Sequence, residues 1–143
     1  MATDEWRAGA LVAARYRLLR PVGSGGLGAA WLARDEASAS ECCLKLVRES
    51  DPAASRLLRF EFEQLRAIDH PHLLGALDFG VIPGDPPRAF FTSRYVAGGS
   101  LARAALEGPA LERVLAQTAL ALGALHRRQL VHGDVKADNV MID

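Results

Sequence analysis

Short stretches with apolar residues at every second position, or with continuous apolar character, occupy much of the first two thirds of the chain. Such stretches, bounded by glycine, proline and small polar residues, are typical of β-strands. The expected strands are residues 16–22, 29–33, 41–47, 73–80 and 88–96. The turns between most of them are short, which favours an antiparallel sheet.

Other segments carry apolar residues at the spacing of a helix. The first is expected to begin at Asp51, a capping residue followed by Pro52, and to end before Pro71 because proline cannot continue a helix. Two further helices, then a loop with a short strand, are expected at residues 100–107, 111–128 and 131–143. The sequence therefore predicts an α+β fold: an antiparallel sheet with one main helix, followed by a mostly helical part.

The composition excludes several classes of protein. Half of the residues are hydrophobic, which allows a folded core, and the formal net charge is zero. This balance removes any whole-chain argument for a nucleic acid or an acidic membrane as partner. The start of the chain lacks a signal-peptide pattern, and the longest apolar stretch is too short to cross a bilayer. We therefore expect a cytoplasmic protein with neither a nucleic acid nor a membrane as partner.

Cys42 and Cys43 are neighbours in the sequence. Adjacent cysteines rarely form a relaxed disulfide, because the bond requires a particular separation and torsion. They also lack the second pair of ligands that a zinc site would need. Both are therefore expected to be free thiols.

Arginine outnumbers lysine by fifteen to two, and asparagine occurs once. Arginine is a planar fork and lysine a compact charge, so a site shaped for one does not accept the other. The two lysines are Lys45 and Lys136, and the asparagine is Asn139. All three fall within short motifs that carry chemistry, which argues against random residue usage.

The first motif is Gly23-x-Gly25-x-x-Gly28. Glycines allow backbone amides to approach phosphate oxygens closely and to form an anion-binding nest. The same residues would suit an ordinary hairpin turn. They would also suit a dinucleotide-binding turn if residues 29–33 were helical and an acidic residue followed about 20 positions on.

The second motif contains Lys45, seventeen residues after Gly28 in an apolar strand. A lysine in a buried strand is costly unless it is paired, although a lysine at a strand edge could simply reach solvent. Binding phosphate below the glycine loop would require a carboxylate partner. Glu61 and Glu63 are the candidates, and Glu61 is favoured because it lies nine residues before His70.

The third motif is residues 132–139, which read His-Gly-Asp-Val-Lys-Ala-Asp-Asn. Asp134 could accept the proton of an attacking hydroxyl, and Lys136 could neutralise a transferring phosphate. Asn139 could offer a neutral oxygen to magnesium. The alternative is a polar surface loop, against which the apolar flanks of the segment argue.

Taken in order, these motifs resemble the protein kinases, whose pattern is a glycine-rich loop, a lysine strand, a helix glutamate, a His-Pro turn and a His-Arg-Asp-x-Lys-x-x-Asn loop. The resemblance covers nearly the whole chain and implies ATP, Mg²⁺ and transfer of phosphate to serine or threonine of a protein substrate. The residues implied in nucleotide binding are Val22, Gly23, Ser24, Gly25, Gly26, Leu27, Gly28, Ala30, Cys43, Lys45, Glu61, Ser93, Arg94 and Val96. Those implied in catalysis are Asp134 as base, Lys136 as its assistant and Asn139 as magnesium ligand.

The resemblance also implies a division of the chain. Residues 1–14 would be a lead, residues 15–96 an N-lobe with a five-stranded antiparallel sheet and one main helix, and residues 97–143 part of a helical C-lobe. Ser93 would be the gatekeeper, the side chain at the back of the adenine pocket, and the backbone of residues 94–96 would meet adenine.

The sequence departs from the kinase pattern in three respects. Ala30 and Cys43 stand where valine and alanine are usual, and both are small enough to be tolerated. Gly133 replaces an arginine that in many kinases holds an activation-loop phosphate. In kinases a metal-binding Asp-Phe-Gly segment follows the catalytic loop, and residues 140–143 do not contain it. We therefore expect an incomplete and inactive kinase portion, or one that needs a partner chain to complete the C-lobe.

Three other functions would account for part of these motifs. Small-molecule kinases of the aminoglycoside or choline type use a His-Gly-Asp loop, which Gly133 fits, but Lys136 is the choice of protein kinases. A pseudokinase or nucleotide-binding module would bind ATP without transferring phosphate. A dinucleotide-binding dehydrogenase would leave Lys45, Glu61 and the loop at 132–139 unexplained.

Overall fold

A computed structural model describes residues 6–24, 28–47 and 51–143. The chain divides into two compact units. The first unit comprises Met1–Ala67 together with Gly75–Tyr95, and the second comprises Ile68–Leu74 together with Val96–Asp143.

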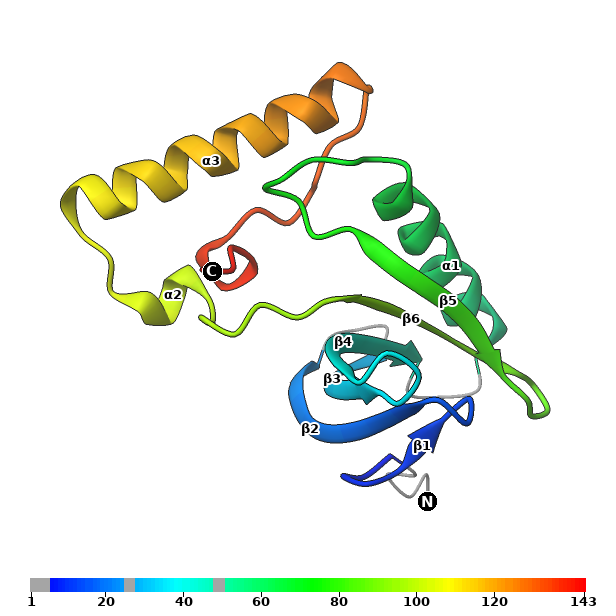
Figure 1. Ribbon diagram of the computed structural model, residues 1–143. Coiled ribbons are helices and arrows are strands. Elements are labelled where there is room, and N and C mark those ends of the chain that lie inside the picture. Colours follow the sequence, from blue (N-terminus) through cyan, green and yellow to red (C-terminus); the bar gives the residue numbers. More distant parts are fainter. Residues whose placement is uncertain (1–5, 25–27, 48–50) are drawn as a thin grey trace. The chain divides into compact units, whose positions relative to one another are not determined.

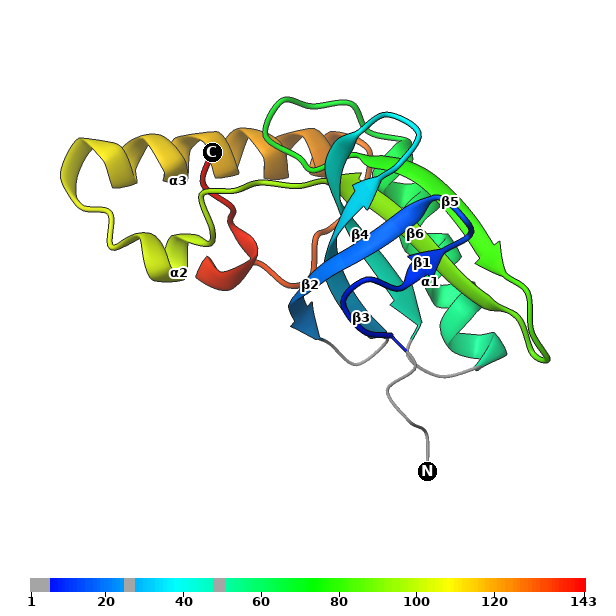
Figure 2. The same cartoon turned by 60° about the horizontal axis from the view of Figure 1, so that its bottom comes forward.

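The first unit is built on one antiparallel sheet in the order β1-β2-β3-β4-β6-β5 (Figure 1). Its strands are β1 Leu11–Val12, β2 Tyr16–Ser24, β3 Gly28–Asp35, β4 Ser40–Val47, β5 Ala76–Ile82 and β6 Arg88–Arg94. The prediction of five strands was wrong by one, because β1 pairs with the start of β2 and lies inside the expected lead (Figure 2). Two residues are too few to show a strand period.

Helix α1, Pro52–Arg66, packs against β4, β5 and β6. The carboxylate of Asp51 accepts a hydrogen bond from the amide of Ala53 at 2.8 Å, which satisfies a donor at the start of the helix. The buried residues Ala54, Leu58 and Phe62 recur every fourth position. This spacing places them on one face of the helix, directed to the sheet.

The two faces of the sheet contribute to two separate hydrophobic clusters. One cluster includes Leu44, Leu46 and Phe90, and the other includes Phe91 together with the buried face of α1. Phe90 and Phe91 are consecutive in β6, so their side chains point to opposite faces. The sheet is therefore buried on both sides over this region, which fixes the register of β4 and β6.

The second unit contains helix α2, Leu101–Ala104, helix α3, Gly108–Arg127, and a 3₁₀ turn η1, Ala137–Asn139. Helix α2 is shorter than predicted because Ala105 adopts a left-handed conformation with φ of 47°. The short strand expected near the end is reduced to an isolated bridge between Ser100 and Met141. Among the residues that the structure describes, none of the helices has the length and apolar character needed to span a bilayer.

Candidate active site

A transverse row of residues crosses five strands of the sheet. Gly23, Ala30, Lys45, Phe91 and Phe79 are successive Cα partners on β2, β3, β4, β6 and β5. Directly opposed residues on neighbouring strands share a face of the sheet. The register therefore brings Gly23 and Ala30 next to Lys45, as binding of one ligand by all three would require.

Cys43 and Ser93 lie on this same face, two residues from Lys45 and Phe91, and are Cα partners of each other. Burial raises the pKa of the Cys43 thiol, and a hydrogen bond with Ser93 partly opposes that rise. Cys42 points to the opposite face, where burial and the nearby Asp35 raise its pKa to about 11. Both cysteines are free thiols, which confirms the expectation from the sequence.

Lys45 forms an ion pair with Glu61 of helix α1. Its ammonium donates to both carboxylate oxygens at 2.8 Å, and the two side chains are about one third exposed. Glu63 instead pairs with Arg59, one turn earlier on the same helix, at 3.2 Å. The expectation that Glu61 faces Lys45 is confirmed, while the role of the pair in binding phosphate stays a prediction.

The glycine motif is described only in part, because Gly25, Gly26 and Leu27 lie outside the described residues. Gly23 and Ser24 end β2, and Gly28 begins β3. A side chain at Gly28 would collide with the carbonyl oxygen of Leu46, so only glycine allows this approach of the two strands. Residues 28–35 form a strand, which removes the dinucleotide-binding alternative that needed a helix there.

The remaining residues predicted to bind nucleotide lie at the ends of strands and in the segment that follows β6. Val22 falls at a register shift in β2 and is 38% exposed. Arg94 ends β6, and Val96 is a buried residue of the second unit. No contact shown by the structure tests their predicted roles.

The predicted catalytic side chains come together in the second unit. The amide nitrogen of Asn139 donates to the backbone oxygen of Asp134 at 2.9 Å and to its carboxylate at 3.0 Å. The ammonium of Lys136 lies 3.5 Å from the other carboxylate oxygen of Asp134. The backbone amide of Asp134 in turn donates to Nδ1 of His132 at 3.1 Å. The loop therefore presents a carboxylate held between an ammonium and an amide.

Local backbone conformation shapes this loop. Gly133 has φ of +83°, a conformation that residues with a side chain rarely adopt. After η1, the amide of Leu101 donates to Val140 at 2.7 Å, and the amide of Ile142 donates to Gly99 at 2.8 Å. These bonds attach the end of the loop to the segment that precedes α2.

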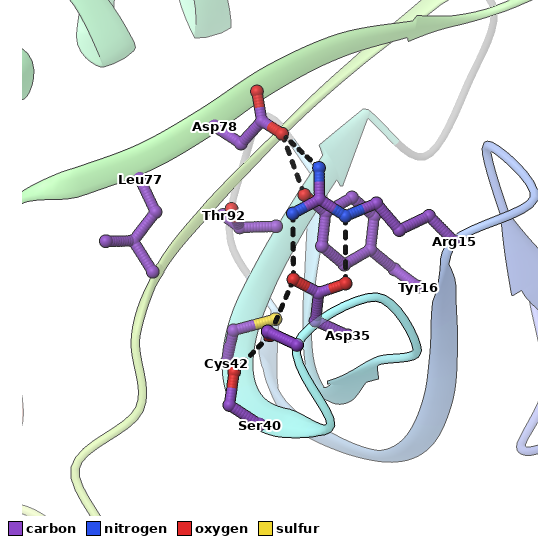
Figure 3. Close-up of a pocket in the computed structure, with 9 residues that line it drawn as sticks. Arg15, Tyr16, Asp35, Ser40, Cys42, Leu77, Asp78 and Thr92 are labelled. Carbon is purple, nitrogen blue, oxygen red and sulfur yellow. Dashed lines mark hydrogen bonds and ion pairs between the residues drawn. The ribbon is translucent and has the colours of Figure 1, made fainter.

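A charged cluster that the sequence did not predict lies elsewhere in the first unit (Figure 3). The guanidinium of Arg15 donates to both oxygens of Asp35 at 2.8 Å and to Asp78 at 2.9 Å, and Tyr16 also donates to Asp78 at 2.9 Å. The cluster lines a cavity of about 220 Å³. It connects β5 with β2 and β3, from which β5 is separated in the sheet order.

The cluster changes the titration of its members. The hydrogen bonds from Arg15 hold the pKa of Asp35 well below its usual range. Burial, assisted by Asp78, raises the pKa of Tyr16 to about 12. Residues 78–80 spell Asp-Phe-Gly, but they belong to strand β5 and Asp78 is engaged with Arg15 and Tyr16. We therefore interpret this cluster as structural.

Comparison with known proteins agrees with this arrangement. The family described as "Protein kinase domain" matches residues 16–143. The chain belongs to the protein kinase family. It is 37% identical over 144 residues to the DNA damage-responsive serine/threonine-protein kinase RqkA of Deinococcus radiodurans, covering 94% of this chain and 21% of that protein. It is 28% identical over 143 residues to the serine/threonine-protein kinase PrkC of Bacillus subtilis, covering 94% of this chain and 22% of that protein.

Solved kinase structures share the fold. The crystal structure of the PknI kinase domain of Mycobacterium tuberculosis matches with a TM-score of 0.70 and 25% sequence identity, covering 95% of this chain and 57% of that one. The protein-kinase-like fold predicted from the sequence is therefore confirmed. The chain spans about a fifth of the length of the two relatives above and somewhat more than half of the PknI domain.

Proposed function

We propose that these residues serve magnesium-dependent transfer of phosphate from ATP to serine or threonine hydroxyls of a protein substrate. The observation that carries the proposal is the Lys45–Glu61 ion pair, set on the same row of the sheet as Gly23 and Ala30. The Glu61 carboxylate accepts two hydrogen bonds from the Lys45 ammonium and keeps this side chain extended. The ion pair therefore sets the direction of the third N–H of Lys45. Lys45 would hold the α- and β-phosphates of ATP.

The second unit would supply the chemistry of the acceptor. Asp134 would orient the substrate hydroxyl and accept its proton, and Lys136 would neutralise charge that develops on the transferred phosphate. The 3.5 Å separation of these two side chains suits both roles. The relatives named as serine/threonine-protein kinases support this class of acceptor.

The donor set fits a magnesium ion in part. Asn139 uses its amide nitrogen on Asp134, which leaves its amide oxygen as the atom for a hard cation. Among the described residues there is no group of three or more His, Cys, Asp or Glu side chains placed to hold a metal ion. Asn139 would therefore share the ion with the phosphates of ATP, and the ion would neutralise their charge.

The binding part of the proposal can be tested on residues 1–143 with titration calorimetry, using ATP and magnesium. Lys45→Ala should weaken binding by about ten-fold or more, because a charge-assisted contact to phosphate is lost. Arg17→Ala is the matched control, since it removes an exposed cation of the same unit that pairs with Glu36 and lies outside the Lys45–Glu61 arrangement. Unchanged affinity in Lys45→Ala, or no binding by the wild type, would contradict the proposal.

We further propose that residues 1–143 alone do not turn over ATP. The sequence after Asn139 contains no second metal-binding carboxylate of the Asp-Phe-Gly type, and phosphoryl transfer depends on metal ions and on positioning. The test combines this polypeptide with magnesium, labelled ATP and a generic protein substrate. Transfer of label by the wild type, together with its loss in Asp134→Ala, would contradict the proposal that residues 1–143 are inactive.

One observation favours a second acceptor class. Gly133 gives the loop the His-Gly-Asp sequence of small-molecule kinases, and its positive φ shows that the loop uses the freedom of glycine. Lys136 beside Asp134 favours a protein acceptor instead. The protein substrate, a partner chain that completes the C-lobe and the cytoplasmic location all stay predictions.

A further inference from the structure

We propose that Phe62 is a positioning residue: held between Phe79 and Phe91, it fixes helix α1 so that Glu61 reaches Lys45 before any nucleotide is bound. The importance of this position for catalysis rests on the proposed function of Lys45. The positioning itself is a property of the first unit.

The rings of Phe62, Phe79 and Phe91 form the contact that holds helix α1 on the sheet, and we call these three residues the seat of the helix. The Phe62 ring centroid lies 5.3 Å from that of Phe79 and 6.1 Å from that of Phe91, with interplanar angles of 42° and 48°. Phe62 and Phe91 are 7% and 3% exposed. Tilted aromatic pairs at these distances attract one another beyond simple burial, so the three rings favour one placement of α1.

The row across the sheet connects this seat to Lys45. Lys45, Phe91 and Phe79 are successive Cα partners on β4, β6 and β5. The ammonium of Lys45 lies 6.0 Å from the centroid of the Phe91 ring. Glu61 and Phe62 are consecutive in α1, so they point in directions about 100° apart around the helix axis. When the Phe62 ring packs against the rings of Phe79 and Phe91, Glu61 is directed toward Lys45.

Two arginines of the same helix reinforce the arrangement. The guanidinium carbon of Arg66 lies 5.7 Å from the centroid of the Phe62 ring, and that of Arg59 lies 5.6 Å from the centroid of the Phe79 ring. Cations over aromatic faces are attracted by the ring electrons. A rotation of α1 that withdrew Glu61 would break these contacts together with the ring packing. The ion pair is thus formed by contacts inside the first unit.

Helix α1 also offers a matched control. Phe60 lies two residues before Phe62 but is 60% exposed. Replacing Phe60 with leucine changes the same side chain on the same helix without touching the seat. The comparison of Phe60→Leu with Phe62→Leu therefore separates the position from the residue type.

The chain has two lysines, Lys45 and Lys136. Selective ¹³C labelling of lysine therefore gives two side-chain Cε signals, which Lys136→Arg assigns. Glu61→Gln gives the signal of Lys45 without its ion pair. In the absence of nucleotide, Phe62→Leu should move the Lys45 signal most of the way to the Glu61→Gln position. Phe79→Leu should move it in the same direction, and Phe60→Leu should leave it at the wild-type position.

Tryptophan fluorescence checks that each variant is folded, and Phe79→Leu decides the matter if Phe62→Leu does not fold. The proposal is overturned if folded Phe62→Leu or Phe79→Leu keeps the wild-type signal. It is also overturned if Glu61→Gln has the same signal as the wild type, because the pair is then absent without nucleotide. These measurements use no ATP, so a failure of the proposed nucleotide binding would leave their outcome unchanged.

Discussion

The first and second units hold their predicted functional residues by different means. Around Lys45 the first unit is buried on both faces of its sheet, and helix α1 contributes a buried face of its own. In helix α3 of the second unit, among the described residues, only Ala121 and Leu125 are buried, while Leu115 and Leu120 are more than half exposed. Asp134 is held by hydrogen bonds within its own loop.

The difference shows two ways of organising a site. Side-chain packing fixes the position of Lys45 and Glu61, so a change in a distant core residue reaches them through the sheet. Backbone conformation and short-range hydrogen bonds fix Asp134 and Asn139, so local changes should matter there and core changes should not. Substitutions matched between the two units test this contrast.

The largest effect is expected from truncation in the core of the first unit. Leu44 is fully buried between β3 and β6, whereas Leu120 of α3 is 60% exposed. Leu44→Ala should lower the free energy of unfolding by about 2–5 kcal/mol because it leaves a cavity. Leu120→Ala should change it by about 0.5 kcal/mol or less.

Urea unfolding checks this, followed by circular dichroism and by tryptophan fluorescence. Both tryptophans, Trp6 and Trp31, belong to the first unit, so fluorescence reports on that unit alone. Equal losses in the two variants would show that the second unit is packed as firmly as the first, and the contrast would be wrong.

The sequence predicted the strands and helices that carry a strong local pattern. The strand expected at 41–47 is observed as Ser40–Val47, and the helix expected from Pro52 is observed as Pro52–Arg66. Alternation and a proline start identify such elements from neighbouring residues alone. Helix α3 begins three residues before the expected position, because Gly108 and Pro109 at its start are not typical helix-interior residues.

The sequence could not give contacts between distant residues. The register that puts Phe91 beside Lys45 and Phe79 depends on how three strands align. Arg15 and Asp78 are 63 positions apart. Arg15 belongs to no motif, and the Asp-Phe-Gly triplet that begins at Asp78 lies in strand β5, ahead of residues 132–139. The Lys45–Glu61 pair was predictable because each partner falls within a motif of the protein kinases. The resemblance to that family, and no local pattern of the chain, indicated which two residues would pair.

The next effect in size concerns the acidic limit of the first unit. Arg15 lowers the pKa of Asp35, so the folded state binds this proton less readily than the unfolded chain. The resulting stabilisation is present above the unfolded pKa of about 4 and is lost as the pH falls below it. Asp35→Asn should therefore destabilise the protein at neutral pH and flatten its loss of stability in acid.

Urea unfolding of the wild type and of Asp35→Asn, followed by tryptophan fluorescence from neutral pH to acid, measures this dependence. Glu36→Gln is the control, because Glu36 forms its ion pair with Arg17 at the exposed end of β3. Parallel curves for wild type and Asp35→Asn would show that Asp35 does not set the acidic limit.

A smaller effect on stability, with a clear effect on binding, is expected at Ser93. Its partner on β4 is Cys43, so a large side chain at Ser93 would occupy the same face of the sheet as Lys45. A purine inhibitor with a bulky substituent should bind Ser93→Phe about ten-fold more weakly than wild type, about 1.4 kcal/mol. Equal affinity for both proteins, measured by titration calorimetry, would refute the gatekeeper assignment.

The smallest effect on global stability is expected at Gly133, in the loop that holds Asp134 and Asn139. A side chain here meets no atom within 4 Å, so Gly133→Ala adds only the strain of φ near +83°, about 1–2 kcal/mol and local to the loop. The urea midpoint followed by tryptophan fluorescence should stay unchanged.

The chain has a single asparagine, so asparagine-selective ¹⁵N labelling gives one side-chain amide, that of Asn139. This signal should move, because its hydrogen bonds to Asp134 depend on the backbone at Gly133. A stationary amide signal, or a fall of the midpoint like that of Leu44→Ala, would show that the loop is not organised locally.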